Sequence, residues 1–132
     1  SLAPATESLS EVTVSKSNDK PSAYDEYFAG NYKSAAGKFD DLVKDNPDDL
    51  EAKYYLGLSN YNANKMNKAI SAFDDILSQP DNLFTDGALW YKAQALIEKG
   101  KESDALPLLK QLSSKQNSYQ QSASEQLLDL EE

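Results

Sequence analysis

An alanine followed four residues later by a large apolar residue occurs three times in this chain. The pairs are Ala35 with Phe39, Ala69 with Phe73 and Ala105 with Leu109, so successive copies are 34 and then 36 residues apart. A period of this length is typical of arrays of helical hairpins. Such arrays offer other chains an extended curved surface rather than a reaction centre, so the repeat constrains the class of function as well as the fold.

The composition indicates one water-soluble helical domain. The chain has 132 residues, of which 39% are hydrophobic and 27% charged, and this is enough for one compact unit. No run of eighteen apolar residues occurs, so we expect no insertion of this segment into a membrane. The net charge of −9 disfavours nucleic acid as a partner, because binding it requires clustered cations, and it also disfavours an anionic membrane surface.

The residue types that most often carry catalysis and metal binding are missing. The chain has no cysteine and no histidine, which removes disulfides, thiolate ligands, the commonest general base and the commonest metal ligand. We therefore expect no enzyme activity, no metal and no cofactor, unless the chain is a regulatory or substrate-presenting domain of a longer enzyme. The chain begins at Ser1 rather than Met, so we expect a trimmed or processed product that has lost a targeting segment.

The pattern along the chain predicts a leader followed by a repeat domain. Residues 1–20 are rich in Ser and Thr and lack helical spacing, which indicates a flexible leader or linker. Residues 21–132 form the repeat domain, with repeats at about 21–47, 48–81 and 84–117 and a closing helix at 118–130. Each repeat is predicted to contain two helices, and the closing helix shields the last face of the array.

The turns and the facing residues agree in register. Gly30, Asn64 and Gly100 fall at the turn inside each hairpin, and these residue types tolerate the left-handed backbone that ends a helix. Small residues recur on both helices, at Ala23, Gly57 and Ala93 and at the three alanines named above, so the two helices of a hairpin can approach closely. Pro107 lies early in the sixth helix, where we expect a local adjustment and no break.

These residues resemble those of tetratricopeptide repeat proteins over roughly residues 21–130. The second copy carries the likeness best, with Leu56-Gly57, Tyr61, Ala69-Ile70 and Phe73. The resemblance implies an all-α fold: a right-handed superhelix of about three hairpins plus a C-terminal capping helix. The run Asp86-Gly87-Ala88-Leu89-Trp90-Tyr91-Lys92-Ala93 is also similar to repeat proteins of bacterial cell envelopes. That second likeness implies a periplasmic or membrane-tethered location, the alternative being cytoplasmic.

In this family the first helix of each hairpin lines a concave binding face. The matching positions are Tyr24, Tyr27 and Phe28 in the first copy, Glu51, Tyr54, Leu58, Tyr61 and Asn62 in the second, and Trp90, Gln94, Ile97 and Glu98 in the third. These residues predict an aromatic groove with an acidic fringe. The lysine, asparagine and arginine clamp that some members use for a peptide carboxylate is missing, so we expect an apolar, aromatic or basic segment of a partner protein.

Other interpretations of the same residues stay open. Aromatic residues at helical spacing are often core, and Tyr55 and Tyr91 are equally good candidates for the buried positions. The leader or a second molecule could occupy the groove. The acidic pairs Asp40-Asp41 and Asp74-Asp75 recur at equivalent places, which favours an exposed helix face over a metal or catalytic site. The predicted function is a noncovalent protein–protein interaction scaffold. The alternative is a self-associating structural module of a bacterial envelope complex.

Overall fold

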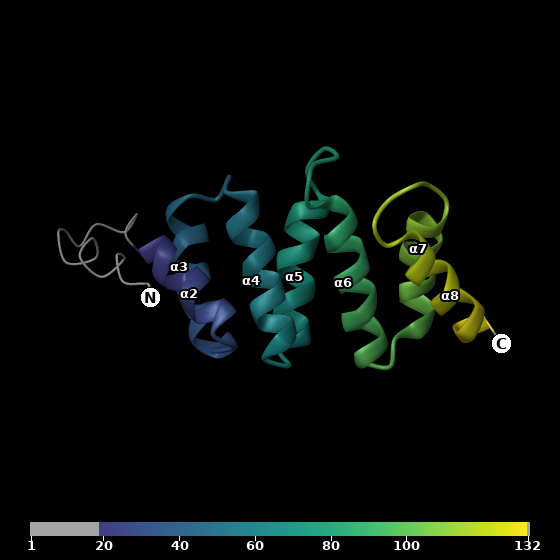
Figure 1. The fold of residues 1–132 in the computed structure, drawn as a ribbon, viewed down its shortest axis with the longest axis horizontal. Coiled ribbons are helices and arrows are strands. Elements are labelled where there is room, and N and C mark those ends of the chain that lie inside the picture. Colours follow the sequence, from purple (N-terminus) through teal and green to yellow (C-terminus); the bar gives the residue numbers. More distant parts are fainter. Residues whose placement is uncertain (1–18, 132) are drawn as a thin grey trace.

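The computed structural model describes residues 19–131, and this part of the chain is all helical (Figure 1). The helices are α2 (Asp19–Phe28), α3 (Tyr32–Asp45), α4 (Leu50–Asn62), α5 (Met66–Leu77), α6 (Thr85–Glu98), α7 (Glu102–Ser113) and α8 (Gln120–Glu131). They form three antiparallel hairpins in a row, α2–α3, α4–α5 and α6–α7, with α8 at the far end. The expected superhelix of helical hairpins is confirmed, whereas the predicted flexible leader lies almost entirely outside the described residues.

The same helix-ending turn closes the first helix of every hairpin. Gly30, Asn64 and Gly100 have positive φ angles of 86°, 62° and 79°, which confirms the prediction of a left-handed residue at each turn. In each case the amide of the following residue reaches back five residues, as Lys101 N–H donates to the Leu96 carbonyl at 2.8 Å. This is the Schellman arrangement, in which a left-handed residue allows the last free carbonyls of a helix to be bonded.

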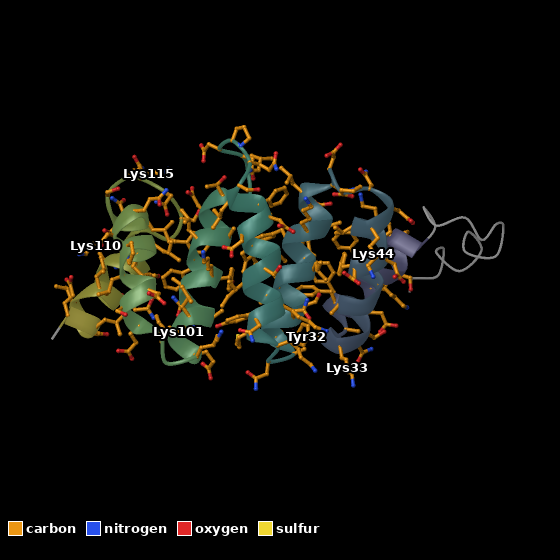
Figure 2. The ribbon with its side chains drawn as sticks, turned by 180° about the vertical axis from the view of Figure 1, so that it is seen from behind. Tyr32, Lys33, Lys44, Lys101, Lys110 and Lys115 are labelled. Atoms are coloured by element: carbon orange, nitrogen blue, oxygen red, sulfur yellow. The ribbon has the colours of Figure 1, made fainter. Side chains whose placement is uncertain are left out.

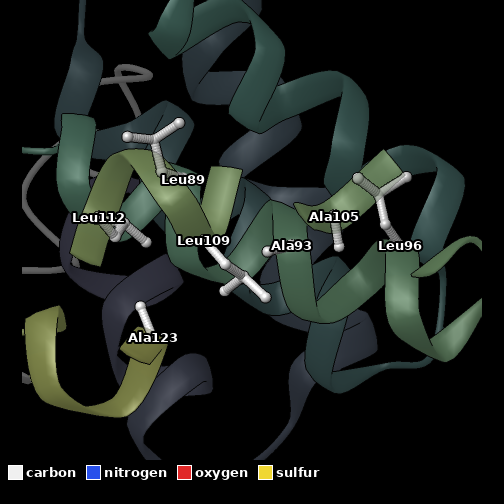
Figure 3. Close-up of a cluster of buried hydrophobic side chains, with 7 residues drawn as sticks. All are labelled: Leu89, Ala93, Leu96, Ala105, Leu109, Leu112 and Ala123. Carbon is white, nitrogen blue, oxygen red and sulfur yellow. The ribbon is translucent and has the colours of Figure 1, made fainter. Parts of the chain in front are cut away.

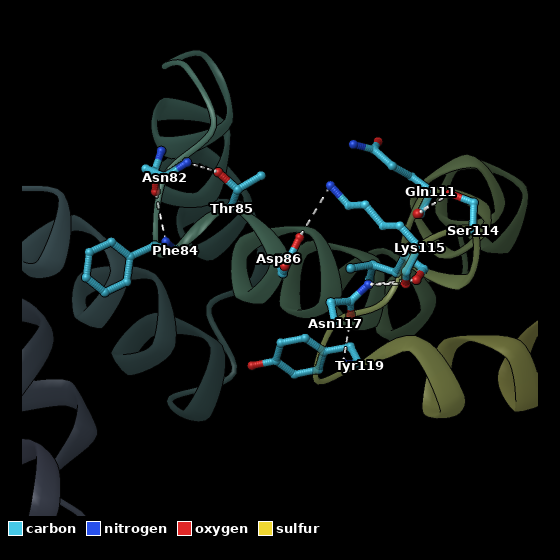
Figure 4. A network of polar contacts seen from close by, with 10 residues as sticks. Asn82, Phe84, Thr85, Asp86, Gln111, Ser114, Lys115, Asn117 and Tyr119 are labelled. Carbon is cyan, nitrogen blue, oxygen red and sulfur yellow. Dashed lines mark hydrogen bonds and ion pairs between the residues drawn. The ribbon is translucent and has the colours of Figure 1, made fainter.

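A second recurring turn precedes the first helix of each following unit. Asn46, Asn82 and Asn117 each accept a hydrogen bond on the side-chain oxygen from the amide two residues later, at 3.3, 2.9 and 2.7 Å. Figure 4 shows the second and third of these turns, which place Phe84 and Tyr119 directly before α6 and α8. An asparagine side chain that bonds its own backbone in this way fixes the direction in which the next helix starts.

Close contact within the hairpins comes from small residues on facing helices. Ala23, Ala35, Ala69, Ala93 and Ala105 are fully buried. Gly57 makes the tightest approach, because a Cβ atom there would lie 2.8 Å from two atoms of the Phe73 ring and closer still to a third.

The large residue of each repeat fills the space beside these small ones. Phe39, Phe73 and Leu109 have no exposed surface. The core is therefore a row of similar clusters, one for each repeat, rather than a single central mass.

The last cluster shows how the array ends. Leu109 and Leu112 of α7 pack with Leu89 and Ala93 of α6, and Ala123 of α8 completes the cluster (Figure 3). Leu127 and Leu130 of α8 pack against it as well. Helix α8 therefore covers the last hairpin, as expected of a closing helix. Pro107 lies inside α7, which continues from Glu102 to Ser113 without a break, as predicted.

Candidate functional site

The predicted site residues lie on α2, α4 and α6, and direct contacts link these helices and α8. At the first end, the Tyr24 hydroxyl of α2 donates a 2.8 Å hydrogen bond to Glu51 Oε1 of α4. Burial raises the pKa of Tyr24, and the hydrogen bond and negative charge of Glu51 raise it further. The Tyr24 ring contacts Phe39 and Tyr55 edge-on, with centroids 4.9 and 5.0 Å away. The ring of this tyrosine therefore packs against the core, whereas its hydroxyl group belongs to the predicted face.

Tyr55 lies at the centre of the aromatic residues of the first two repeats. Its ring contacts Tyr27 at 5.1 Å and Phe28 at 6.0 Å, besides Tyr24. Burial raises the pKa of Tyr27, although a hydrogen bond from Asn62 acts in the opposite direction. Phe28 contacts the same cluster but remains 70% exposed. It is the most accessible large apolar side chain among the predicted site residues.

Tyr54 fills the space between the second and third repeats. Its ring contacts Phe84 at 5.3 Å, and its hydroxyl lies against Gly87 so closely that a Cβ there would overlap it. Burial raises the pKa of Tyr54, and its hydrogen bond with Tyr119 adds to the shift. Tyr54 and Tyr119 are 65 residues apart, so this contact bridges α4 to the start of α8.

Tyr61 continues the face along α4. Its ring contacts Tyr91 of α6 edge-on at 5.6 Å. Burial raises the pKa of Tyr61, and the negative charge of Glu98 contributes. Glu98 and Asn62 are exposed at the C-terminal ends of α6 and α4. This part of the face therefore combines a phenol with a carboxylate and an amide.

The third repeat contributes residues that α8 partly covers. Trp90 stacks on Tyr119, with centroids 5.7 Å apart and ring planes 17° from parallel. Gln94 and Gln126 exchange two amide hydrogen bonds, at 2.7 and 3.0 Å. Ile97 packs against the cluster formed by α6, α7 and α8. This end of the face is therefore occupied by the chain itself to a greater extent than the first end.

The predicted residues differ in how much surface they offer. Leu58 is 7% exposed and belongs to the buried cluster around Phe73 and Ile76, so it is a core residue beneath the face and not part of its surface. The exposed members are Phe28, Glu51, Asn62 and Glu98, and the partly buried ones are Tyr24, Tyr27, Tyr54, Tyr61, Trp90, Gln94 and Ile97. The result is a surface of tyrosine edges and hydroxyl groups held by mutual contacts, bordered by two carboxylates.

Several aromatic residues beside this surface, Tyr55 among them, were not among the predicted site residues. Tyr91 is partly buried, and Phe84 and Tyr119 lie in the turns before α6 and α8, outside the helical spacing used for the prediction. Leu128 of α8 is a further exposed apolar side chain, at 67%. The recurring Asn-x-aromatic sequence, Asn82-Leu83-Phe84 and Asn117-Ser118-Tyr119, is the signal that could have identified the two turn residues.

Five lysines are divided between the two ends of the array. In Figure 2, Lys33 and Lys44 lie at one end of the array and Lys101, Lys110 and Lys115 at the other. Within residues 19–131, no group of three or more metal-ligating side chains comes together. None of the described helices is long and apolar enough to cross a membrane.

The comparisons with known proteins agree with this arrangement. Residues 22–83 match the family model of the tetratricopeptide repeat. A TPR repeat-containing protein of Methanocaldococcus jannaschii is 33% identical over 90 residues, which are 66% of this chain but 28% of that protein. The chain therefore covers less than a third of that relative's length.

Proposed function

Because this chain belongs to the tetratricopeptide repeat family, whose repeats generally mediate protein–protein interaction, we propose that it binds a segment of a partner protein. The binding surface is the concave aromatic face formed by α2, α4 and α6, with α8 at its end. The interaction is noncovalent, and members of the family are typically scaffolds without catalytic activity. Binding would hold the partner segment in an extended or helical form on a surface that is already ordered.

The observation that supports this proposal best is the mutual support of the aromatic side chains. Tyr24 contacts a polar group of α4, and Tyr54 and Trp90 each contact a ring in the turn before a later helix, so their rotamers are set before a partner arrives. Tyrosine and tryptophan present large contact areas at a small cost in side-chain entropy, and they dominate binding energy at protein interfaces. An ordered row of such residues is therefore suited to binding.

The chemistry of the face favours a partner segment that is apolar or basic. Phe28 offers exposed apolar surface at the first end. Glu51 and Glu98 add negative charge beside tyrosine hydroxyls, and the chain as a whole carries a net charge of −9. Complementary charge speeds association and helps to select the partner.

The test is a pull-down from a lysate of the source cell that compares wild type with Phe28→Ala and Leu83→Ala. Phe28 is 70% exposed, so its truncation should leave the fold intact, which circular dichroism checks. Leu83 is 94% exposed in the loop between α5 and α6, and it serves as the matched control for loss of an exposed apolar side chain. We expect a protein that wild type and Leu83→Ala retain and Phe28→Ala loses. Equal recovery by all three would count against the concave face.

Self-association is the second candidate function, and the exposure of two apolar side chains favours it. Phe28 on α2 and Leu128 on α8 are 70% and 67% exposed, at the two ends of the array. A module that associates through such ends could organise a complex in a bacterial envelope, as the likeness of residues 86–93 implies. Sedimentation over a range of concentrations separates the two functions, because the scaffold stays monomeric whereas the self-associating module gains mass.

A further inference from the structure

A second groove lies on the outer side of the array, away from the aromatic face. It is an open hollow of about 390 Å³ between α3 and α5, the second helices of two successive hairpins, with α4 beneath. Its walls are low because the α3 side carries Ala36 and Gly37 and the α5 side carries Ser71 and Ala72. None of the predicted site residues lines it.

The floor of this groove contains a mostly buried side-chain amide. Asn60 of α4 is 6% exposed, and its side-chain nitrogen donates to the Leu56 carbonyl at 3.1 Å. Asn60 is one of the residues that line the groove. The oxygen of this amide can accept a hydrogen bond from a ligand that brings a donor.

Negative charge stands on both rims of the groove. Asp40 lies on the α3 side and Asp75 on the α5 side, and Lys68 is the cation among the lining residues. Asp40 pairs with Lys44 one helical turn away at 3.0 Å, but both side chains are at least half exposed, so this pair is weak and easily exchanged. Asp75 forms no ion pair with the described residues. The lining residues themselves therefore carry two carboxylates and one ammonium group.

The equivalent position in the next repeat, between α5 and α7, is occupied by a lysine of the chain itself. Lys92 of α6 is equivalent to Leu56 of α4, because the first helices of these two repeats are offset by 36 residues. Asp74 of α5 is equivalent to Asp40 of α3, with an offset of 34 residues. There the Lys92 ammonium forms a 2.6 Å ion pair with Asp74, and its side chain is 24% exposed. Larger residues also fill that position, since Ile70, Leu77 and Leu108 pack against the core cluster beneath. The chain thus fills the second position with its own lysine and leaves the first one open.

We propose that the groove between α3 and α5 binds a lysine side chain of a partner protein, in the place that Lys92 takes in the next repeat. The ammonium group contacts Asp40 and the Asn60 oxygen, and the aliphatic stem lies on Leu56, Val43 and Ala72. Lysine suits such a site because its stem buries on apolar surface while its head stays with polar groups. This site is independent of the concave face and would add a second point of attachment on the opposite side.

The test is an NMR titration with acetyl-Ala-Lys-Ala-amide, compared with the same peptide carrying norleucine in place of lysine. Uniformly ¹⁵N-labelled protein reports through the Asn60 side-chain amide and the Gly37 backbone amide. We expect saturable shifts of these signals with the lysine peptide, weaker at high salt, and none with the norleucine peptide. No saturable shift, or the same shift with both peptides, would overturn the proposal.

The matched variant is Leu56→Lys, which gives the first groove the residue that the second already has. We expect this lysine to pair with Asp40 and to abolish the response to the lysine peptide. A folded Leu56→Lys protein that responds like wild type would contradict the proposal. If circular dichroism shows that Leu56→Lys does not fold, Asp40→Asn replaces it. The Asp40 side chain is half exposed, so this variant should fold, and its response to the lysine peptide must be weaker than that of wild type. An unchanged response in Asp40→Asn would again overturn the proposal.

Discussion

Gly57 and Gly37 lie in the middle of helices, but the fold needs a glycine only at the first position. A Cβ on Gly57 would overlap the Phe73 ring, whereas a Cβ on Gly37 would meet nothing within 4 Å. Glycine in a helix interior is unfavourable by about 0.5–1 kcal/mol relative to alanine. Close packing compensates for this cost at Gly57, and no contact within the chain does so at Gly37.

The first prediction follows from this difference. We expect Gly57→Ala to lower the free energy of unfolding by about 1–3 kcal/mol, because the new methyl group forces the Phe73 ring to move in a filled core. Gly37→Ala is the matched control and should raise the free energy of unfolding by about 0.5–1 kcal/mol. Urea denaturation measures both. Two changes of the same sign would contradict the close contact between Gly57 and Phe73.

The second prediction concerns tyrosine ionisation and pH. The pKa values of Tyr24 and Tyr54 are raised in the fold, mainly by burial. Above the ordinary tyrosine pKa of about 10, an unfolded tyrosine loses its proton while these two keep theirs, so stability falls as the pH rises. We expect the free energy of unfolding to decrease between pH 10 and 12, and to decrease less steeply in Tyr54→Phe. Parallel pH profiles for both proteins would show that Tyr54 does not carry the effect.

At the scale of elements, two kinds of turn set the direction of each helix that follows α2. The hairpin turns carry Gly30, Asn64 and Gly100, and the turns between repeats carry an asparagine that bonds the backbone two residues on. The first kind could be predicted because a left-handed residue at a fixed offset is a strong local signal. The second kind was not, because asparagine occurs in many contexts and only repetition of the hydrogen bond reveals its role.

The third prediction tests the hairpin turns. We expect Gly100→Ala to lower the free energy of unfolding by about 1–2 kcal/mol, since a side chain in the left-handed region clashes with its own backbone. Asn64→Gly is the control, because Asn64 already adopts a φ of 62° and glycine accepts that angle without strain. Thermal or urea unfolding of both variants measures the difference. A Gly100→Ala protein as stable as wild type would mean that the turn adopts another conformation.

The aromatic residues show where prediction from helical spacing ends. Spacing identified Tyr54 and Trp90 as members of the face, and each also packs against a ring, Phe84 and Tyr119, that lies in a turn. Periodicity describes positions within one helix. It therefore gives no information on side chains that lie in a turn, such as Phe84 and Tyr119. It also placed Leu58 on the face, although the tyrosines packed around its cluster leave it buried.

At the scale of the whole molecule, each repeat is stabilised by its neighbours, and the last hairpin depends on α8. Leu109 and Leu112 are fully buried in the cluster that Ala123 completes. In arrays of this kind stability is roughly a sum over repeats and the interfaces between them, so the removal of an end unit exposes an interface.

The fourth prediction is that a chain ending at Ser118, without α8, loses about 2–4 kcal/mol of unfolding free energy. The estimate follows from partial exposure of two leucines, since full burial of one contributes about 1.5–3 kcal/mol. A chain ending at Leu130 is the control and should unfold like wild type. Urea denaturation at equal protein concentration compares the three. If the shorter chain were as stable as wild type, α8 would not be the closing element of the array.

Hydrogen–deuterium exchange on the complex with the captured partner tests the central claim, a partner segment on the concave aromatic face, most directly. We expect added protection in α2, α4 and α6, the helices that carry the face, with the strongest gain around Phe28 and Tyr61. Segments of α3, α5 and α7 that lie far from the outer groove should exchange as in the free protein. Protection confined to α3, α5 and α7, with none on the first helices of the hairpins, would contradict the account.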